Sequence, residues 1–123
     1  MMVGQFLPSR EFVVDLLVSN DEGEQVSLSA VVDTGFSGYL TLPLSVIRRL
    51  NLPQTDTEEA SIADGSIIRF GVYQAIVEWE EEERMVAALA TEGDALIGIS
   101  LMMKSIGTFE FEEGGSVFFE PTG

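Results

Sequence analysis

The sequence predicts an all-β domain, built mainly of antiparallel strands with one or two short helices. Short apolar segments with a period of two recur along the chain, which is typical of half-buried strands. Clusters of Asn, Asp and Gly separate these segments and predict turns. The length of 123 residues suits one domain over residues 1–123, and no repeat or linker divides it. We expect about seven or eight strands in a closed barrel or a sandwich.

The first predicted hairpin joins Phe12–Val18 to Gln25–Val32. Every second residue of the first segment is apolar, so one of its faces is wholly apolar. Residues 20–23, Asn-Asp-Glu-Gly, supply the turn. This hairpin places Asp33 at the end of its second strand.

A short helix is predicted over Pro43–Leu50. Proline fits the first helical turn, where no backbone donor is missed. Leu44, Ile47 and Leu50 fall on one stripe of such a helix. The polar segment Gln54–Ala60 that follows is predicted to be a loop.

Asp64-Gly65, between the apolar pairs of Ser61–Ile68, predicts a tight hairpin turn with positive φ at both central residues. From the residues alone, this segment is interpreted as an ordinary surface hairpin. Arg69–Glu80 is predicted as a long strand, and Arg84–Ala90 pairs back with it across a Glu-rich turn.

The last third of the chain is predicted as a strand, a short helix and a hairpin. Ala95–Met103 is an apolar strand that runs into a helix, with Gly98 at the bend. Lys104, the only lysine, is expected to be a solvated helix residue. Gly107–Phe111 and Ser116–Glu120 form the closing hairpin.

The composition excludes several kinds of chemistry. The chain has no His and no Cys, which excludes zinc sites of the usual type, iron–sulfur clusters and His-ligated haem. Ser–His and Cys–His nucleophile pairs are excluded for the same reason. No glycine-rich phosphate loop is present. We therefore predict no cofactor and no metal, and carboxylates must supply any catalysis.

The charge disfavours nucleic acids and anionic membranes as partners. Six basic and 21 acidic residues give a net charge of −15, which repels phosphate groups. No apolar stretch approaches the roughly 20 residues that span a bilayer. The first residues show no signal peptide, so we expect a cytoplasmic protein, which the lack of Cys fits. The acidic run around Trp79 is interpreted as a solvated turn, because its spacing matches no calcium loop.

Asp33-Thr34-Gly35 is the motif with the clearest chemical meaning. An isolated motif of this kind indicates only a strand that ends in an Asp turn. Here Val31-Val32 precedes it and Phe-Ser-Gly-Tyr-Leu follows it. A helix, Ala-Asp-Gly-Ser and Ile-Gly-Ile come later in the chain. This ordered set resembles the retropepsin-like (clan AA) aspartic proteases, in particular their small single-domain prokaryotic type.

The resemblance implies a closed acid-protease barrel that hydrolyses peptide bonds in peptides or proteins. It implies that Asp33 is catalytic. Thr34 would form a hydrogen bond between two catalytic loops, and Gly35 would let the backbone donate to the carboxylate. The Asp-Gly hairpin would be a flap over the substrate. The implied substrate-binding residues are Ala63, Asp64, Gly65 and Ser66.

Peptide hydrolysis by carboxylates needs two of them. One acts as a base on water, and the other is protonated and polarises the carbonyl group. Two close carboxyl groups share one proton, because ionising both would bring like charges together. The chain has a single Asp-Thr-Gly, so we predict a two-fold homodimer with Asp33 of each copy on the axis.

Two departures from the family pattern keep alternatives open. Pepsin-like relatives have Ser directly after Asp-Thr-Gly, where this chain has Phe36, and no aromatic residue flanks Asp64 in the predicted flap. One alternative is a catalytically weak module of the same fold that dimerises or binds peptides. The other is an unrelated β-barrel binding protein in which Asp33 is a structural turn residue.

Overall fold

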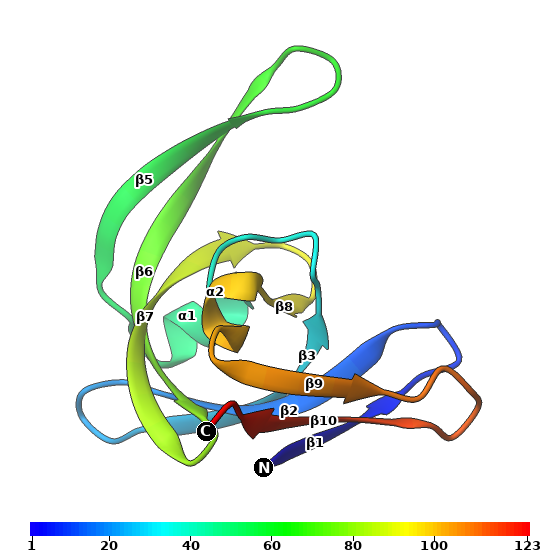
Figure 1. Cartoon of the computed structure of the whole chain (residues 1–123). Helices are drawn as coiled ribbons and strands as arrows, with labels where there is room; N and C mark the ends of the chain where they lie inside the picture. The colour runs from blue at the N-terminus through cyan, green and yellow to red at the C-terminus, as the bar shows by residue number, and fades with distance from the viewer.

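Ten strands form one continuous sheet, and six of them close into a barrel (Figure 1). The computed structural model describes all 123 residues. The elements are β1 (Met2–Phe6), β2 (Phe12–Ser19), β3 (Gln25–Val32), β4 (Leu40–Pro43), α1 (Leu44–Arg49), β5 (Gln54–Ser61), β6 (Ile67–Trp79), β7 (Glu82–Thr91), β8 (Ala95–Ile97), α2 (Ile99–Met102), β9 (Ser105–Phe109) and β10 (Ser116–Pro121). The strand order is β5-β6-β7-β4-β8-β3-β2-β1-β10-β9, and a further pairing of β6 with β2 closes the barrel. The predicted all-β class with two short helices is confirmed.

The β2–β3 hairpin forms as predicted and supplies one wall of the core. Val13 to Ser19 pair antiparallel with Val31 to Gln25. The apolar face of β2 points into the barrel, where its side chains are at most 7% exposed. This face consists of Phe12, Val14, Leu16 and Val18. The period-two pattern was therefore sufficient to locate this hairpin and its inner face.

The sheet contains two parallel pairings that the sequence did not predict. β3 runs parallel to β8, and β4 runs parallel to β7. β4 is a four-residue strand whose Leu40 and Leu42 are fully buried. A four-residue segment shows no clear periodicity, so the sequence alone does not predict this strand. With β1 and β5, it raises the number of strands from the predicted seven or eight to ten.

The prediction of a loop over Gln54–Ala60 is wrong, because this segment is strand β5. It pairs antiparallel with β6 from Ser61 opposite Ile67 to Gln54 opposite Tyr73. Every residue of β5 is exposed, so the segment carries no apolar alternation. This segment is a strand because its backbone pairs with β6, and not because its side chains are buried. The β5–β6 arm projects from the barrel (Figure 1).

The turn at the tip of this arm differs from the predicted type. Gly65 has a φ of +86°, but Asp64 does not have a positive φ. The Gly65 N–H donates to the Ile62 carbonyl, and the Ile62 N–H donates to the Ser66 carbonyl. This is a three-residue hairpin loop with glycine in the left-handed position. The hairpin itself is confirmed, and its turn is one residue longer than predicted.

β1 lies between β2 and β10 and requires a glycine at its centre. A Cβ atom at Gly4 would lie 2.0 Å from the Val13 carbonyl oxygen. Only glycine therefore allows the backbones of β1 and β2 to approach at this point. The same glycine interrupts the apolar alternation of Met2 and Phe6, so the pattern did not reveal this strand.

The helices lie close to their predicted places. α1 buries Ile47, and Leu50 follows as its buried C-cap residue. Lys104 does not lie in a helix as expected: it follows α2 with a φ of +65° and is exposed. β9 begins two residues earlier than predicted and ends at Phe109. Neither helix has the length and apolar character that crossing a bilayer requires.

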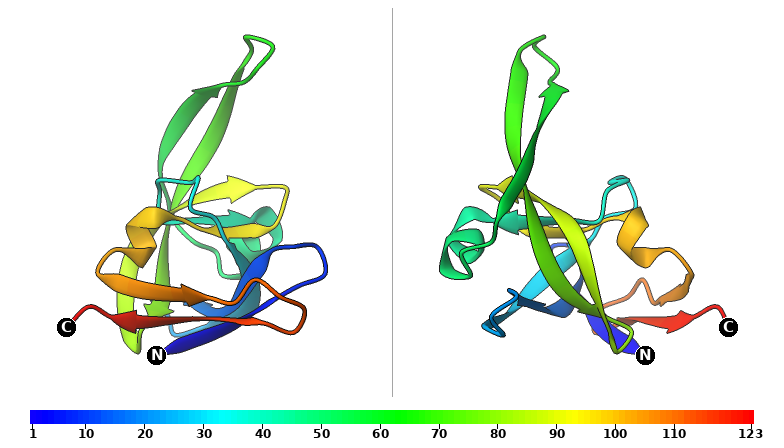
Figure 2. Two further views of the ribbon diagram at one scale, coloured as in Figure 1. Left: turned by 45° about the vertical axis from the view of Figure 1, so that its right-hand side comes forward. Right: turned by 90° about the vertical axis from the view of Figure 1, so that its left-hand side faces the viewer.

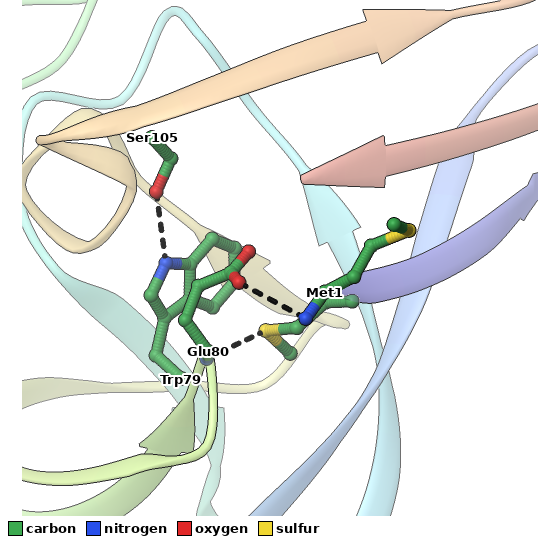
Figure 3. Close-up of polar contacts among 5 residues, drawn as sticks. Met1, Trp79, Glu80 and Ser105 are labelled. Carbon is green, nitrogen blue, oxygen red and sulfur yellow. Dashed lines mark hydrogen bonds and ion pairs between the residues drawn. The ribbon is translucent and has the colours of Figure 1, made fainter. Parts of the chain in front are cut away.

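The Glu-rich turn between β6 and β7 is a hairpin turn as predicted, but one of its acidic residues is not solvated. The Glu80 side chain is 8% exposed, and its Oε2 lies 3.3 Å from the Met1 amino group. The neighbouring Trp79 is fully buried, and its indole N–H donates to Ser105 Oγ at 3.2 Å (Figure 3). These contacts attach the chain start and the first residue of β9 to the end of β6.

Replacing Ser105 with alanine is expected to lower the free energy of unfolding by about 1–2 kcal/mol, because the buried indole N–H loses its acceptor. Chemical denaturation followed by Trp79 fluorescence measures the change. Ser105→Thr keeps the hydroxyl group in a strand and is the matched control, expected to lie within about 0.5 kcal/mol of the unmodified protein. Equal losses in both variants would contradict the assigned role of the hydrogen bond.

Candidate active site

Asp33 lies directly after β3, where this strand ends beside its parallel neighbour β8. Its N–H donates to the Ile97 carbonyl at 2.9 Å, which continues the ladder between the two strands. Its half-buried carboxylate accepts the Gly35 N–H on Oδ1 at 2.8 Å. Within the chain, Oδ2 has no hydrogen-bond partner. The fold thus fixes one carboxylate oxygen and leaves the other available.

The loop of residues 33–39 is fixed by the segment that follows β8. Four hydrogen bonds run between them although they are about 60 residues apart in sequence. They run from Gly98 N–H to the Tyr39 carbonyl (3.0 Å), from Ile99 N–H to the Phe36 carbonyl (2.8 Å), from Ser100 N–H to the Gly38 carbonyl (3.1 Å) and from Ser100 Oγ to the Ser37 carbonyl (2.6 Å). The loop therefore has one defined conformation, which positions the carboxylate.

Gly98 is the point of closest approach between these two segments. A Cβ atom at this position would lie 2.0 Å from the Gly38 carbonyl oxygen and 2.7 Å from Phe36 Cδ2. The Phe36 ring also covers Gly38, where a Cβ atom would lie 2.6 Å from its Cζ. The two glycines thus make room for an aromatic ring that covers the junction.

Phe36 and Ser100 are structural residues of the site that the sequence did not reveal. In the sequence, Phe36 is only a departure from the family pattern, and Ser100 belongs to no motif. The Ser100 side chain contacts a carbonyl group 63 residues earlier in the chain. A contact between residues so far apart leaves no pattern in the local sequence, so only the folded structure reveals it.

The four predicted substrate-binding residues lie at the tip of the β5–β6 arm. All four are exposed, and no hydrogen bond joins them to the Asp33 loop. Both views in Figure 2 show this tip well away from the barrel. The structure therefore brings Asp33, Thr34 and Gly35 together and does not bring Ala63, Asp64, Gly65 and Ser66 to them within one chain.

The tip is ordered by Asp64. Its Oδ1 accepts the Ser66 hydroxyl at 2.6 Å and the Ser66 N–H at 2.8 Å. These hydrogen bonds, that of the hydroxyl first, stabilise the charged form and lower the pKa of Asp64.

Acidification is expected to loosen the tip. A lowered pKa means that Asp64 contributes order above its unfolded pKa of about 3.9 and loses this contribution as the pH falls through the folded value. Amide exchange at Ser66, followed by NMR, should therefore accelerate below about pH 4, relative to amides in the barrel. Ser66→Ala should raise the titration midpoint of Asp64 toward its ordinary value. An unchanged midpoint would contradict the assigned cause.

A hollow of about 280 Å³ adjoins the Asp33 loop. Thr34 forms one side, α2 and the residues after it form the second, and β9 forms the third. Thr34 is exposed and makes no side-chain hydrogen bond within the chain. A larger hollow of about 590 Å³ lies beside Phe6, Arg10 and Phe111 and contains no residue of the Asp33 loop. We therefore associate the smaller hollow with the candidate site.

One carboxylate in this setting can act as a general base on water, because its Oδ2 is free to accept a proton. The residues that form hydrogen bonds with Asp33 are Gly35, Phe36 and Ile97. None of them has an acidic side chain that could share the proton. Within one chain, Asp33 therefore has no second carboxyl group with which it could share a proton.

The closed barrel with an Asp-Thr-Gly loop at a strand end defines the retropepsin-like fold, and solved structures confirm this fold. A retropepsin-like aspartic protease from Rickettsia conorii superposes with a TM-score of 0.60 and 18% sequence identity, over 95% of this chain and 87% of that one. EIAV protease, in complex with the inhibitor HBY-793, superposes with a TM-score of 0.56 and 12% identity, over 73% of this chain and 83% of that one. No protein-family model and no curated protein sequence matches the chain.

Proposed function

We propose that this protein is an aspartic endopeptidase whose active site forms between two copies of the chain. The observation that carries the proposal is the position of Asp33. Its carboxylate directly follows strand β3 of a retropepsin-like barrel, with one oxygen held by Gly35 and the other free. A fixed, half-buried carboxylate with an available oxygen is what general-base catalysis on water requires.

The proposed reaction uses the two Asp33 carboxyl groups in different protonation states. The ionised one takes a proton from water, and the resulting hydroxide attacks the carbonyl carbon of the peptide bond. The protonated one donates a hydrogen bond to the carbonyl oxygen, which becomes negatively charged. The proton taken from water then passes from its carboxyl group to the amide nitrogen, the C–N bond breaks, and a carboxylic acid and an amine leave. Before the reaction the pair carries one proton, so one carboxyl group is protonated and the other is ionised, because two adjacent carboxylates cannot both stay ionised.

The remaining site residues receive supporting roles in this proposal. Thr34 is exposed beside Asp33, so its hydroxyl can bond the opposite loop of a second copy. Ala63, Asp64, Gly65 and Ser66 contact a bound peptide or protein when the arm bends toward the barrel. No metal or cofactor takes part in these steps. A cytoplasmic location stays a prediction.

The test is cleavage of a peptide library by the purified protein between about pH 4 and about pH 7.5, a range set by the carboxyl chemistry. Mass spectrometry identifies the products, and sedimentation equilibrium measures the dimer on the same samples. We expect cleavage that rises with the dimer fraction. A monomer at micromolar concentration without cleavage would instead favour the unrelated binding protein, because the pair of carboxyl groups could not assemble.

A catalytically weak module of the same fold is the second candidate. The observation that favours it is Phe36, which gives the carboxylate no hydroxyl donor at the position that follows Asp-Thr-Gly. This candidate predicts saturable binding of peptides that are recovered intact. The same library, analysed after binding and release, distinguishes the two functions.

A further inference from the structure

Glu80 is a buried acidic residue that the proposed hydrolysis does not use. Its side chain is only 8% exposed, at the turn between β6 and β7. Its Oε2 lies 3.3 Å from the Met1 amino group, and its backbone N–H donates to the Met2 sulfur at 3.3 Å (Figure 3). Oε1 has no hydrogen-bond partner, and no other buried side-chain oxygen or nitrogen of the chain lacks one. A buried carboxylate oxygen without a donor is unfavourable, so this atom indicates a donor from outside the chain.

Glu80 lines a hollow of about 350 Å³ that has an excess of negative charge. Residues of β2, β3, the end of β6 and the turn after it surround this hollow, and the acidic ones are Asp15, Glu78, Glu80 and Glu81. None of the six lysine and arginine residues lines it, so the Met1 amino group is its only cation. Figures 1 and 2 show the N-terminus next to the β6–β7 turn, at the end of the barrel away from the β5–β6 arm. No residue of the Asp33 loop lines the hollow, so it is separate from the candidate active site.

The carboxylates are spread around the hollow and are not gathered at one point. No group of three acidic side chains in the chain could hold a metal ion. Asp15 lies on β2, where it accepts the Ser29 hydroxyl at 2.9 Å, and Glu78 lies opposite Glu83 in the pairing of β6 with β7. Like charges opposite each other destabilise a strand pair, so a cation beside Glu78 would relieve this repulsion. The arrangement suits several separate positive charges better than one compact ion.

The β6–β7 turn keeps two glutamates in an unfavourable backbone conformation. The φ angles of Glu80 and Glu81 are +54° and +67°. In a two-residue hairpin turn this left-handed conformation favours Asn and Gly, because a larger side chain crowds the backbone. The Glu81 side chain is exposed and forms no ion pair within the chain that would offset this cost. The turn therefore presents a free carboxylate at the hollow at the expense of its own stability.

We propose that this hollow binds an aliphatic polyamine, a flexible chain that carries several ammonium groups. One ammonium group donates to Glu80 Oε1, beside the contact that the Met1 amino group makes with Oε2. The other ammonium groups lie next to Asp15, Glu78 and Glu81, which the chain leaves without a cation. The proposal does not depend on the proposed hydrolase activity.

The remaining walls of the hollow suit the methylene segments of such a ligand. Leu17 and Met2 line it and are only partly buried, so they offer an apolar surface. The volume lies within the range of small-molecule sites, about 300–1,000 Å³. Met1 is exposed and precedes β1, so it can shift aside without breaking a strand pairing. The net charge of −15 raises the local concentration of any polycation, and the hollow selects its shape.

Calorimetric titration with spermidine tests the proposal, at an ionic strength of about 0.15 M that screens non-specific attraction. We expect saturable binding of one spermidine molecule per chain. In NMR spectra of the same titration, the carboxyl carbon resonances of Glu80 and Glu81 should shift with one midpoint. The resonance of Glu113, which lies at a different hollow, should not follow them. Uniform shifts of all carboxyl groups would overturn the proposal.

A compact cation separates shape from charge. Hexaamminecobalt(III) has the same charge as spermidine but cannot reach carboxylates on different sides of the hollow. It should bind at least about tenfold more weakly, the effect of one or two exposed ion pairs. Equal affinities would overturn the proposal, because charge alone would then explain the binding.

Removing the three outer carboxylates should weaken the binding of spermidine. The variant D15N/E78Q/E81Q leaves the contact between Glu80 and Met1 in place. It should bind at least about tenfold more weakly, because each exposed ion pair changes an affinity by about two- to fivefold. Unchanged affinity would show that spermidine does not occupy this hollow.

The variant D21N/E22Q/E113Q is the matched control. It removes the same charge from exposed turns that do not line the hollow. Its affinity for spermidine should stay within about twofold of that of the unmodified protein, since exposed charges outside a site contribute little. Equal losses in both triple variants would overturn the assigned site.

Glu81→Gly separates binding from stability. Glycine adopts the left-handed conformation without strain, so the melting temperature should not fall. The affinity for spermidine should nevertheless fall by about two- to fivefold, because one carboxylate is lost. Full affinity in this variant would contradict the role of Glu81. Absence of any spermidine binding would refute this inference and leave the proposed function intact, and spermidine binding without peptide cleavage would do the reverse.

Discussion

Asp33→Asn is expected to lower kcat/KM for peptide cleavage by at least about a thousandfold, the scale of general acid–base catalysis. Asparagine has nearly the same shape and can still accept the Gly35 N–H on its carbonyl oxygen. It cannot take a proton from water or share one with a second carboxyl group. The loss should therefore fall on kcat, while peptide binding and the dimer persist. Single-turnover cleavage together with sedimentation measures both.

Asp21→Asn is the control for this experiment. It removes the same charge from an exposed turn between β2 and β3 and should leave cleavage unchanged. A mixture of D33N with an excess of the unmodified protein should retain activity only in proportion to the dimers with two aspartates. Cleavage that survives D33N would contradict a role for Asp33 and would indicate a contaminating protease or another site.

Gly98→Ala is expected to lower the free energy of unfolding by about 3 kcal/mol or more, at the upper end of the cost of overpacking. The added Cβ atom would lie 2.0 Å from the Gly38 carbonyl oxygen. The obstacle is backbone, so no side-chain rotation relieves it. The chain must separate the Asp33 loop from the start of α2, which breaks hydrogen bonds such as that from Ser100 to Gly38. Denaturant titration measures stability, and cleavage should fall beyond the loss of folded protein.

Gly93→Ala is the matched control for this substitution. The Cβ atom there would meet only Thr91 Oγ1 at 3.7 Å, and the φ of Gly93 is not positive. Alanine should therefore change stability by less than about 0.5 kcal/mol. Similar losses in both variants would show that the close approach at Gly98 is not the cause.

Some elements could be predicted because their information is local. The alternating face of β2 and the turn after it determine the first hairpin, and the burial of Leu16 and Val18 confirms this. β1, β4 and β5 could not be predicted in this way. Gly4 interrupts the pattern of β1, β4 is only four residues long, and β5 has no buried residue at all. Each of them is a strand because of its neighbour in the sheet.

Some residues of the candidate site could likewise be predicted from the sequence, and others could not. Asp33, Thr34 and Gly35 are adjacent in sequence, so their motif revealed them, and their catalytic role stays a proposal. Phe36 and Ser100 hold the loop through contacts with distant residues, which no motif records. The tip residues were found through the Asp-Gly turn, although the turn is not of the type that the pair predicts. The contact of the buried Glu80 with Met1 joins residues that are far apart in sequence, so it could come only from the structure.

The β5–β6 arm has a consequence for any ligand that it touches. The arm is a two-stranded ribbon with no covered face along β5, whereas β6 continues into the barrel wall. A ribbon of this kind is marginally stable in water by itself. It keeps conformational entropy that a ligand would have to remove on contact, which lowers affinity and shortens residence times. Such an arm favours rapid exchange of any ligand that it contacts over tight retention.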